Sequence, residues 1–167
     1  MLTCVKGNIF EAGTEAIVNP VNCIGNMSGG LAKEFKKQFP DNYKFYKSAC
    51  KLGQIDIGNL LIYKLPSELK QLREEIYFLE PPADLKYIVN FPTMITPRLP
   101  SDYEYIKQGL EDLICYIMYK DIKSIAIPAL GCGIGGLEWD KVKMILEQYL
   151  TRLINKKNVK ILIYEPL

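Results

Sequence analysis

The chain has 167 residues, of which 49% are hydrophobic, a composition that predicts one domain over residues 1–167 with a core large enough to need no disulfide or metal staple. A net charge of +2, spread along the whole chain, gives no strong signature of a polyanion-binding protein. The absence of any histidine excludes Ser–His–Asp and Cys–His catalysis and histidine-based metal sites.

Cysteine usage and hydropathy indicate the compartment. The five cysteines are odd in number, widely spaced and free of any C-x-x-C pair, so neither a zinc site nor a disulfide framework is predicted. No apolar run is long enough to cross a membrane, and no signal-peptide pattern opens the chain. We therefore expect a cytoplasmic protein with no membrane partner, no metal and no cofactor.

Apolar periodicity, capping residues and glycine or proline breaks define the elements along the chain. We expect strands over 2–6, 16–19, 60–65, 87–91, 125–127 and 159–164. Between them we expect a helix over 31–39 stopped by Pro40, a second helix capped by Asp41 and a short surface helix within 67–82. The later helices are expected over 101–119, opened by a Ser101–Glu104 capping box, and over 139–155. Strands that alternate with helices predict an α/β fold with helices on both faces of a sheet.

Two glycine-rich loops carry most of the functional information. Residues 19–32 and 127–139 each leave an apolar, strand-like run and enter a helix-like run. Glycine lets backbone N–H groups approach a ligand closely, and a helix N-terminus favours negative charge. The two loops together could hold a ligand with a central pyrophosphate from both sides.

The second loop also matches G-x-G-x-x-G at Gly131, Gly133 and Gly136. A dinucleotide fingerprint should open a βαβ unit and be followed by an acidic residue about twenty positions later, and this loop meets neither condition. The Walker phosphate-binding pattern is absent from both loops. Tight turns would explain one such loop, but two loops at strand-to-helix junctions favour a ligand site.

Two asparagines, Asn19 and Asn22, flank a proline where the second predicted strand ends. Ligands of α/β sheets bind beyond the carboxyl ends of the strands, where an amide side chain can donate to and accept from ribose hydroxyls. Ordinary turn chemistry is the alternative, because Asn-Pro is a common turn dipeptide.

At these residues the chain resembles a macro domain, and more narrowly the branch that holds the DNA ADP-ribosyl glycohydrolase antitoxins (the DarG proteins) and the terminal ADP-ribose protein glycohydrolase. The resemblance covers nearly the whole chain and rests on the segments 6–10, 19–22, 24–32, 87–93 and 128–139. It implies a three-layer α/β/α macro domain with a mixed six-stranded sheet and with ADP-ribose in a cleft over the strand ends.

The resemblance also implies roles for individual residues. Asn8 would accept a hydrogen bond from the adenine amino group, the loop 131–137 would wrap the pyrophosphate, and Asn22 would lie nearest the scissile carbon as the catalytic residue. The ligand-binding residues it implies are Asn8, Ile9, Asn19, Asn22, Gly29, Gly30, Leu31, Thr93, Gly131, Cys132, Gly133, Ile134, Gly135, Gly136 and Leu137.

The chain departs from the family pattern at three of these positions. Asn8 replaces an aspartate, so the adenine would be held by an uncharged acceptor. Met94 occupies the position of the branch's catalytic lysine, and a thioether can act neither as nucleophile nor as base. Gly135 occupies the position of an acid that the human-type enzyme uses.

Three functions follow from these observations. The first, which we favour, is an ADP-ribosyl glycohydrolase that works without the lysine, with the ligand's own pyrophosphate positioning the attacking water. The second is a catalytically inactive ADP-ribose reader, and the third is a macro fold that has lost ligand binding. Lys33 and Glu34, one helical turn past the first loop, could reach the ligand, although a solvated helix face explains both.

The expected partners are ADP-ribose, ADP-ribosylated DNA or protein, and a cognate ADP-ribosyltransferase toxin as a candidate. Contacts with single-stranded DNA could come from Arg98, Tyr103, Tyr105 and Lys107, which follow the Met94 loop. Packing of two of these residues into the core is the alternative, and we favour it for Tyr105.

Overall fold

Six strands form one mixed sheet in the computed structural model, which describes residues 1–66 and 84–167. From edge to edge the strands are β1 (Leu2–Val5), β6 (Lys160–Tyr164), β5 (Ser124–Ile127), β2 (Ala16–Val21), β4 (Tyr87–Pro92) and β3 (Leu61–Lys64). All neighbouring pairs are parallel except β3 with β4. The short helix predicted within 67–82 lies outside the described residues.

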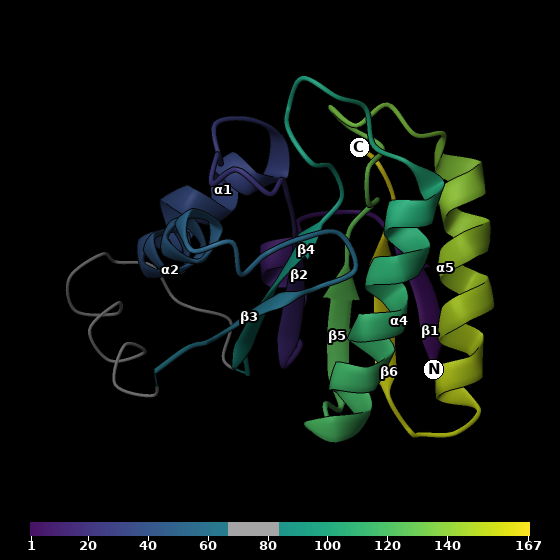
Figure 1. Cartoon of the computed structure of the whole chain (residues 1–167). Coiled ribbons are helices and arrows are strands. Elements are labelled where there is room, and N and C mark those ends of the chain that lie inside the picture. The colour runs from purple at the N-terminus through teal and green to yellow at the C-terminus, as the bar shows by residue number, and fades with distance from the viewer. Residues whose placement is uncertain (67–83) are drawn as a thin grey trace.

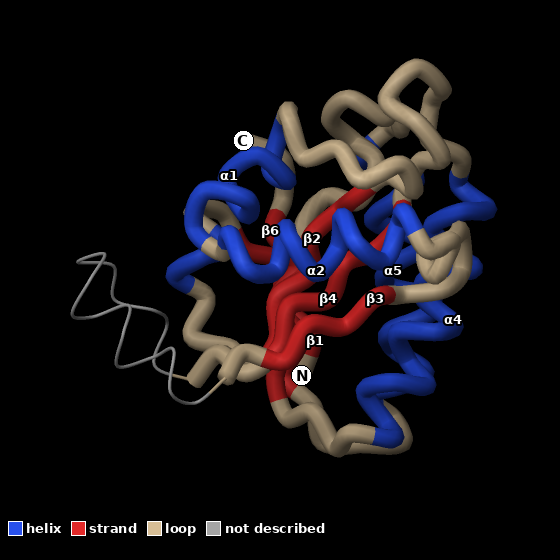
Figure 2. Tube along the Cα trace, turned by 60° about the vertical axis from the view of Figure 1, so that its left-hand side comes forward, coloured by secondary structure: helices blue, strands red, loops and turns tan. Residues whose placement is uncertain are grey.

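Helices cover both faces of this sheet, as Figures 1 and 2 show. The helices α4 (Tyr103–Tyr119) and α5 (Trp139–Ile154) lie on one face, and α1 (Gly30–Gln38) and α2 (Pro40–Lys51) lie on the other. The predicted three-layer α/β/α architecture with a mixed six-stranded sheet is confirmed. No helix in the described ranges combines the length and the apolar character that crossing a membrane requires.

Successive side chains along each central strand enter opposite cores, because strand side chains alternate between the two faces of a sheet. Val18 and Val89 pack against α4 and α5, whereas Ile17 and Ile88 pack with Phe35 of α1 on the other face. The central strands therefore read as continuous apolar runs, which is typical of strands buried on both faces.

Two predicted helix starts were wrong, by two residues for α2 and by one residue for α4. Pro40 is the first residue of α2, because its missing N–H and fixed φ suit the first helical position, and Asp41 lies in the first turn instead of capping it. The cap of α4 is Asp102, whose Oδ1 accepts from the Glu104 N–H at 2.8 Å. Ser101 therefore does not form the predicted capping box.

The carboxyl ends of five strands point to the same edge of the sheet, because β1, β6, β5, β2 and β4 are mutually parallel. The β2–β4 register pairs Val21 with Pro92, and it continues one step further where the Thr93 N–H donates to the Val21 carbonyl at 2.9 Å. The loops that follow these strands gather at this edge, where the C-terminus also lies (Figure 1).

We predict that Gly109→Ala, in the middle of α4, destabilises the fold. A Cβ on Gly109 would overlap the ring of the buried Phe91, so the helix and β4 could not keep their present separation. Helix propensity alone would raise the free energy of unfolding by about 1 kcal/mol. We expect a net loss of about 1–2 kcal/mol, which must then come from the steric clash with Phe91. Urea denaturation measures it.

The matched control is Gly133→Ala, because a Cβ on Gly133 would meet no atom within 4 Å. Its free energy of unfolding should stay within about 0.5 kcal/mol of the unmodified protein. Equal stability of the two variants would show that α4 does not depend on close approach to Phe91.

Candidate functional site

A cleft of about 1080 Å³ lies over the carboxyl ends of the parallel strands. Its walls come from the loops that follow β1, β2, β4, β5 and β6, with residues 7–10, 28–32, 131–135 and 164–167 as the largest segments. Strand order thus brings together loops that are far apart in the sequence, at the edge where α/β sheets bind ligands.

The second glycine loop offers unpaired main-chain donors to this cleft. The N–H groups of Gly133, Ile134 and Gly135 have no acceptor among the described residues, while the loop closes on itself through the Leu137 N–H, which donates to the Gly131 carbonyl at 2.9 Å. Consecutive free N–H groups in a concave loop form an anion-binding site. The loop is therefore suited to hold phosphate oxygens.

Glycine is required at position 135 for steric reasons. A Cβ there would overlap the Ser101 hydroxyl and lie 2.7 Å from the Gly131 carbonyl oxygen. The Gly135 carbonyl also accepts from the Ser101 N–H at 3.0 Å, which fixes the loop against the start of α4. No acid can replace Gly135 without moving this loop, so the departure from the family pattern at this position is built into the local packing.

The first glycine loop ends in a second group of free donors. The N–H groups of Gly30, Leu31 and Ala32, in the first turn of α1, have no acceptor in the described part of the chain, and all three residues line the cleft. No acidic residue occupies this turn and no side chain caps it, so the helix dipole is left open toward the cleft.

The two loops meet at the side chain of Ile134. Its Cδ1 lies 3.0 Å from the point that a Cβ on Gly29 would occupy, although Ile134 is 63% exposed. The loops that carry the two sets of donors are therefore in contact and line the same cleft.

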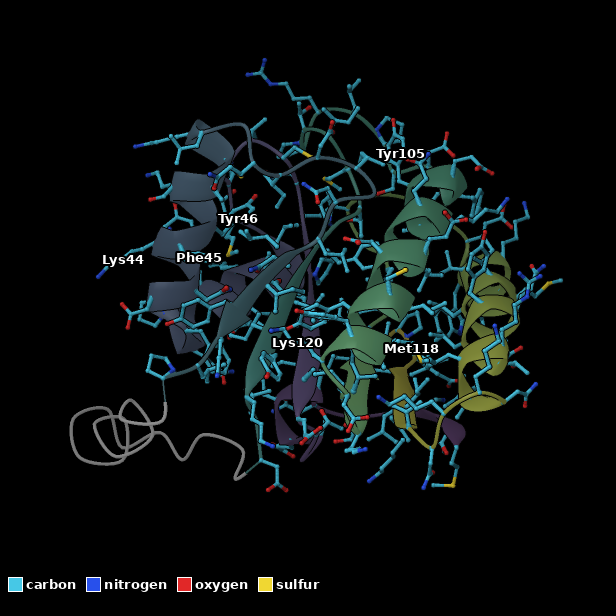
Figure 3. The ribbon with its side chains drawn as sticks, turned by 60° about the horizontal axis from the view of Figure 1, so that its bottom comes forward. Lys44, Phe45, Tyr46, Tyr105, Met118 and Lys120 are labelled. Carbon is cyan, nitrogen blue, oxygen red and sulfur yellow. The ribbon has the colours of Figure 1, made fainter. Side chains whose placement is uncertain are left out.

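Asn22 is held in one orientation by four hydrogen bonds. Its Oδ1 accepts from the N–H groups of Ile24 at 3.1 Å and Asn26 at 3.3 Å and from the Tyr46 hydroxyl at 2.8 Å, and its Nδ2 donates to the Asn26 carbonyl at 2.7 Å. Figure 3 shows Tyr46 on the side of α2 that faces the sheet. Because an amide carries two N–H donors, one Nδ2 hydrogen of Asn22 is left for a ligand in the cleft.

The thiols near the cleft are protonated at neutral pH. Burial raises the pKa of Cys132, which lines the cleft, to about 11. Burial, together with the Asp56 carboxylate, raises the pKa of Cys23 to about 11 as well, and its Sγ donates to the Met94 carbonyl at 3.7 Å. A thiolate is needed for nucleophilic attack, so neither cysteine is a candidate nucleophile.

Side-chain charge is scarce in the cleft. Among the described residues that line it, the charged ones are Glu34 and Glu165, and there is no lysine or arginine. Glu165 is paired with Lys143 at 3.4 Å, whereas Glu34 is solvent-exposed on α1, as expected, and also lines the cleft. Met94 lines the cleft as a buried thioether, 9% exposed.

Most of the predicted ligand-binding residues line the cleft: Asn8, Ile9, Asn22, Gly29, Gly30, Leu31, Thr93, Gly131, Cys132, Gly133, Ile134 and Gly135. Gly136 and Leu137 do not line it, and Leu137 packs against Gly131 and the core. Asn8 has a second task, because its Oδ1 accepts from the Phe10 N–H at 3.1 Å and so caps the short helix η1 (Ile9–Glu11).

Asn19, like Gly136 and Leu137, is a predicted site residue that does not line the cleft. It is fully buried, and its Nδ2 donates to Asn90 Oδ1 at 3.1 Å. Asn90 in turn exchanges hydrogen bonds with Asn42 of α2 at 2.8 and 3.1 Å. The Asn19 side chain therefore lies below the cleft, in an amide cluster that links β2 to β4 and α2. From this position it does not reach a ribose bound in the cleft.

The residues proposed from sequence to contact DNA lie outside the cleft lining. Tyr103 packs against the core and its hydroxyl accepts from the Glu138 N–H at 3.2 Å, whereas Tyr105, for which core packing was favoured, is half-buried outside the core clusters. Lys107 is paired with Glu104 at 2.7 Å. Arg98 is exposed on the loop that carries Met94.

Sequence reasoning missed the wall formed by residues 164–167 after β6. The signal was present, because a strand parallel to β5 must end at the edge where the glycine loops lie. Sequence reasoning also missed that Pro97, in the loop after β4, lines the cleft.

Comparison with known proteins identifies relatives of this chain. The sequence model of the Macro domain family matches residues 75–146. The chain is 42% identical over 166 residues to a DNA ADP-ribosyl glycohydrolase of Thermus aquaticus, a match that covers 99% of the chain and 41% of that protein. The chain thus spans about two fifths of the length of the curated relatives that it matches first.

Solved structures agree. The macrodomain of Mycobacterium tuberculosis DarG superposes with a TM-score of 0.87 at 37% identity, over 100% of this chain and 99% of that one. Thermosipho africanus DarTG in complex with ADP-ribose superposes with a TM-score of 0.86 at 35% identity, over 99% of this chain and 42% of that one. A T. africanus relative of the same identity is named a DNA ADP-ribosyl transferase–DNA ADP-ribosyl glycohydrolase fusion protein.

We predict that Tyr46→Phe loosens Asn22 without unfolding the loop. The substitution removes the hydroxyl, whose one proton is shared between the Asn22 carbonyl at 2.7 Å and Asn22 Oδ1 at 2.8 Å, while the two main-chain donors on Oδ1 remain. The free energy of unfolding should fall by about 0.5–1.5 kcal/mol, the usual contribution of one hydrogen bond. Amide NMR spectra should show shifts centred on the Asn22 side chain. The control is Tyr119→Phe, at a residue 81% exposed, and identical Asn22 signals in both variants would contradict the role of Tyr46.

Proposed function

Since the chain belongs to the macro domain family, in the branch of the DarG macrodomains, we propose that it binds ADP-ribose in this cleft and hydrolyses the glycosidic bond that joins ADP-ribose to a DNA base. The observation that carries the proposal is the pair of facing, unpaired main-chain donor sets in residues 133–135 and 30–32. They surround a cleft of about 1080 Å³, which is ample for a nucleotide-sized ligand.

The cleft suggests how the ligand would lie. The pyrophosphate would accept hydrogen bonds from the two donor sets, with the dipole of α1 adding to the attraction. The adenine would lie toward Asn8 and Ile9. Tyr164, at the end of β6 beside β1, would line the same part of the cleft. The distal ribose would then lie at Asn22 and Met94.

Hydrolysis at the distal ribose would pass through an oxocarbenium-like state, in which the bond from the anomeric carbon to the base breaks as a water oxygen adds. The free Nδ2 hydrogen of Asn22 would orient a ribose hydroxyl, because the other bonds of this amide already fix its plane. The ligand's own phosphate oxygens would accept the proton of the attacking water, and this proton would end on the nitrogen of the departing base, a transfer for which Met94 has no suitable atom.

A reader of ADP-ribose is the second candidate, and Met94 is the observation that favours it. Its buried thioether suits packing against a ribose or base and supplies no acid, base or nucleophile. A reader would use the same donor sets and would stop at binding.

The proposed setting is a reducing cytoplasm, which the free state of all five cysteines supports. The proposed partner is an ADP-ribosyltransferase that modifies the same DNA, because one relative carries transferase and glycohydrolase in a single fusion protein.

We predict that ADP-ribose stabilises the protein and that Gly135→Ala weakens this effect. At a ligand concentration 100 times Kd, the free energy of unfolding should rise by about 2.7 kcal/mol. The substitution must displace the loop, because the alanine Cβ would overlap Ser101. The free N–H groups of residues 133–135 would then no longer point at the phosphate oxygens. Calorimetric titration should show affinity for ADP-ribose at least about tenfold lower, roughly one lost hydrogen-bonding group. Unchanged affinity in a folded variant would contradict the assignment of the pyrophosphate to this loop.

We predict that the protein releases ADP-ribose from ADP-ribosylated single-stranded DNA and that Asn22→Ala lowers kcat about 100-fold, as expected for the loss of one oriented donor. Native mass spectrometry would detect free ADP-ribose and bare DNA. Circular dichroism must show that the variant is folded, because Asn22 also holds the loop 22–26.

Met94→Lys separates hydrolase from reader. Lysine is unbranched and of similar length, so it fits the place that Met94 occupies in the cleft wall. An intact complex with no product from the unmodified protein, together with turnover in Met94→Lys, would establish the reader and reject the hydrolase.

A further inference from the structure

Three large aliphatic side chains are exposed beside the Met94 end of the cleft. Ile24 is 55% exposed, Ile95 39% and Leu99 54%. We call these three residues the apolar rim. Ile24 belongs to the loop after β2, and the other two belong to the loop after β4.

Main-chain hydrogen bonds hold the apolar rim together and attach it to the cleft. The Cys23 N–H donates to the Ile95 carbonyl at 3.0 Å, which places the two isoleucines on adjoining segments. The Leu99 N–H donates to the Thr96 carbonyl at 3.2 Å, which folds the second loop into a turn. The rim is thus continuous with Asn22 and Met94, its sequence neighbours that line the cleft.

The loops that carry the rim favour a polyanion by their own charge, although the Asp56 carboxylate of the segment between α2 and β3 acts on the neighbouring Cys23. The three cleft loops, residues 19–31, 93–100 and 128–137, contain no aspartate or glutamate, and Arg98 is their one charged residue. A phosphodiester chain that crosses this edge would meet one exposed cation and no carboxylate from these loops. The flat apolar face of a base can cover exposed aliphatic carbon.

We propose that the apolar rim is the platform for the base that carries ADP-ribose and for a flanking base of single-stranded DNA, with Arg98 beside a backbone phosphate. This inference rests on the proposed function, because it assumes the distal ribose at Asn22 and Met94. From there the attached base leaves the cleft next to Ile95, which directly follows Met94, and next to Ile24. The rim thereby takes the stacking role that sequence analysis gave to Tyr103, which is engaged with Glu138.

The test compares two ligands on the same variants. Ile24→Ser/Ile95→Ser should bind ADP-ribosylated single-stranded DNA about tenfold more weakly, the loss expected when one base loses its stacking surface. Its affinity for free ADP-ribose should stay within about twofold, because neither side chain lines the cleft. Arg98→Gln should lower the slope of log K against log salt for the modified DNA by about 0.7.

The control is Met144→Ser, which removes a side chain that is even more exposed, 69%, from α5, and it should change neither affinity. The inference is overturned if the rim variant binds modified DNA as tightly as the unmodified protein does. It is also overturned if the variant loses affinity for an ADP-ribosylated peptide as strongly as for DNA, or loses both DNA and free ADP-ribose equally. Failure of the unmodified protein to bind free ADP-ribose would instead reject the proposed function.

Discussion

The parallel pairing of β2 with both β4 and β5 is the constraint on which the site depends. It sends the ends of these strands to one edge, so that the two glycine loops and the Met94 loop share a wall. Parallel strands need crossover connections, and here those connections are the helices that bury both faces of the sheet. The amide cluster of Asn19, Asn42 and Asn90 reinforces the pairing from below, since its hydrogen bonds cross from β2 to β4 and to α2.

The scarcity of side-chain charge determines what kind of binding the cleft can perform. With no lysine or arginine among the described residues that line it, a phosphate must be held by main-chain N–H groups and the dipole of α1. Such donors cannot swing away or titrate, and their directions are set by the fold. This explains why glycine is required at 135, where a Cβ would overlap Ser101, and why the first turn of α1 carries neither a cap nor an acid. Water solvates these donors in the free protein, so a ligand must match their geometry to displace it.

The sequence predicted the layers of the fold and most of the cleft, and the failures have local causes. Glycine loops at strand-to-helix junctions are visible because backbone conformation restricts residue type directly. The start of α4 was misassigned because Ser101 and Asp102 are adjacent residues of similar capping chemistry, and that of α2 because Pro40, which suits the first helical position, was interpreted only as a helix stop. Asn19 was misplaced because β2 continues to Val21, two residues beyond its predicted end, which leaves Asn19 inside the sheet. The contribution of residues 164–167 depends on strand order, which no local pattern encodes.

Binding and chemistry are separable in this cleft, and position 94 shows why. The main chain around Met94 is fixed independently of its side chain, because the Met94 carbonyl accepts from Cys23 Sγ and the next carbonyl, of Ile95, accepts from the Cys23 N–H. Asn22 is fixed just as independently, by Tyr46 and by its own loop. A change of side chain at 94 therefore alters what can happen at the ribose carbon while the donors that hold the rest of the ligand keep their places. The reader and the hydrolase proposed for this cleft therefore differ at one side chain, because the groups proposed to position the ligand belong almost entirely to the backbone.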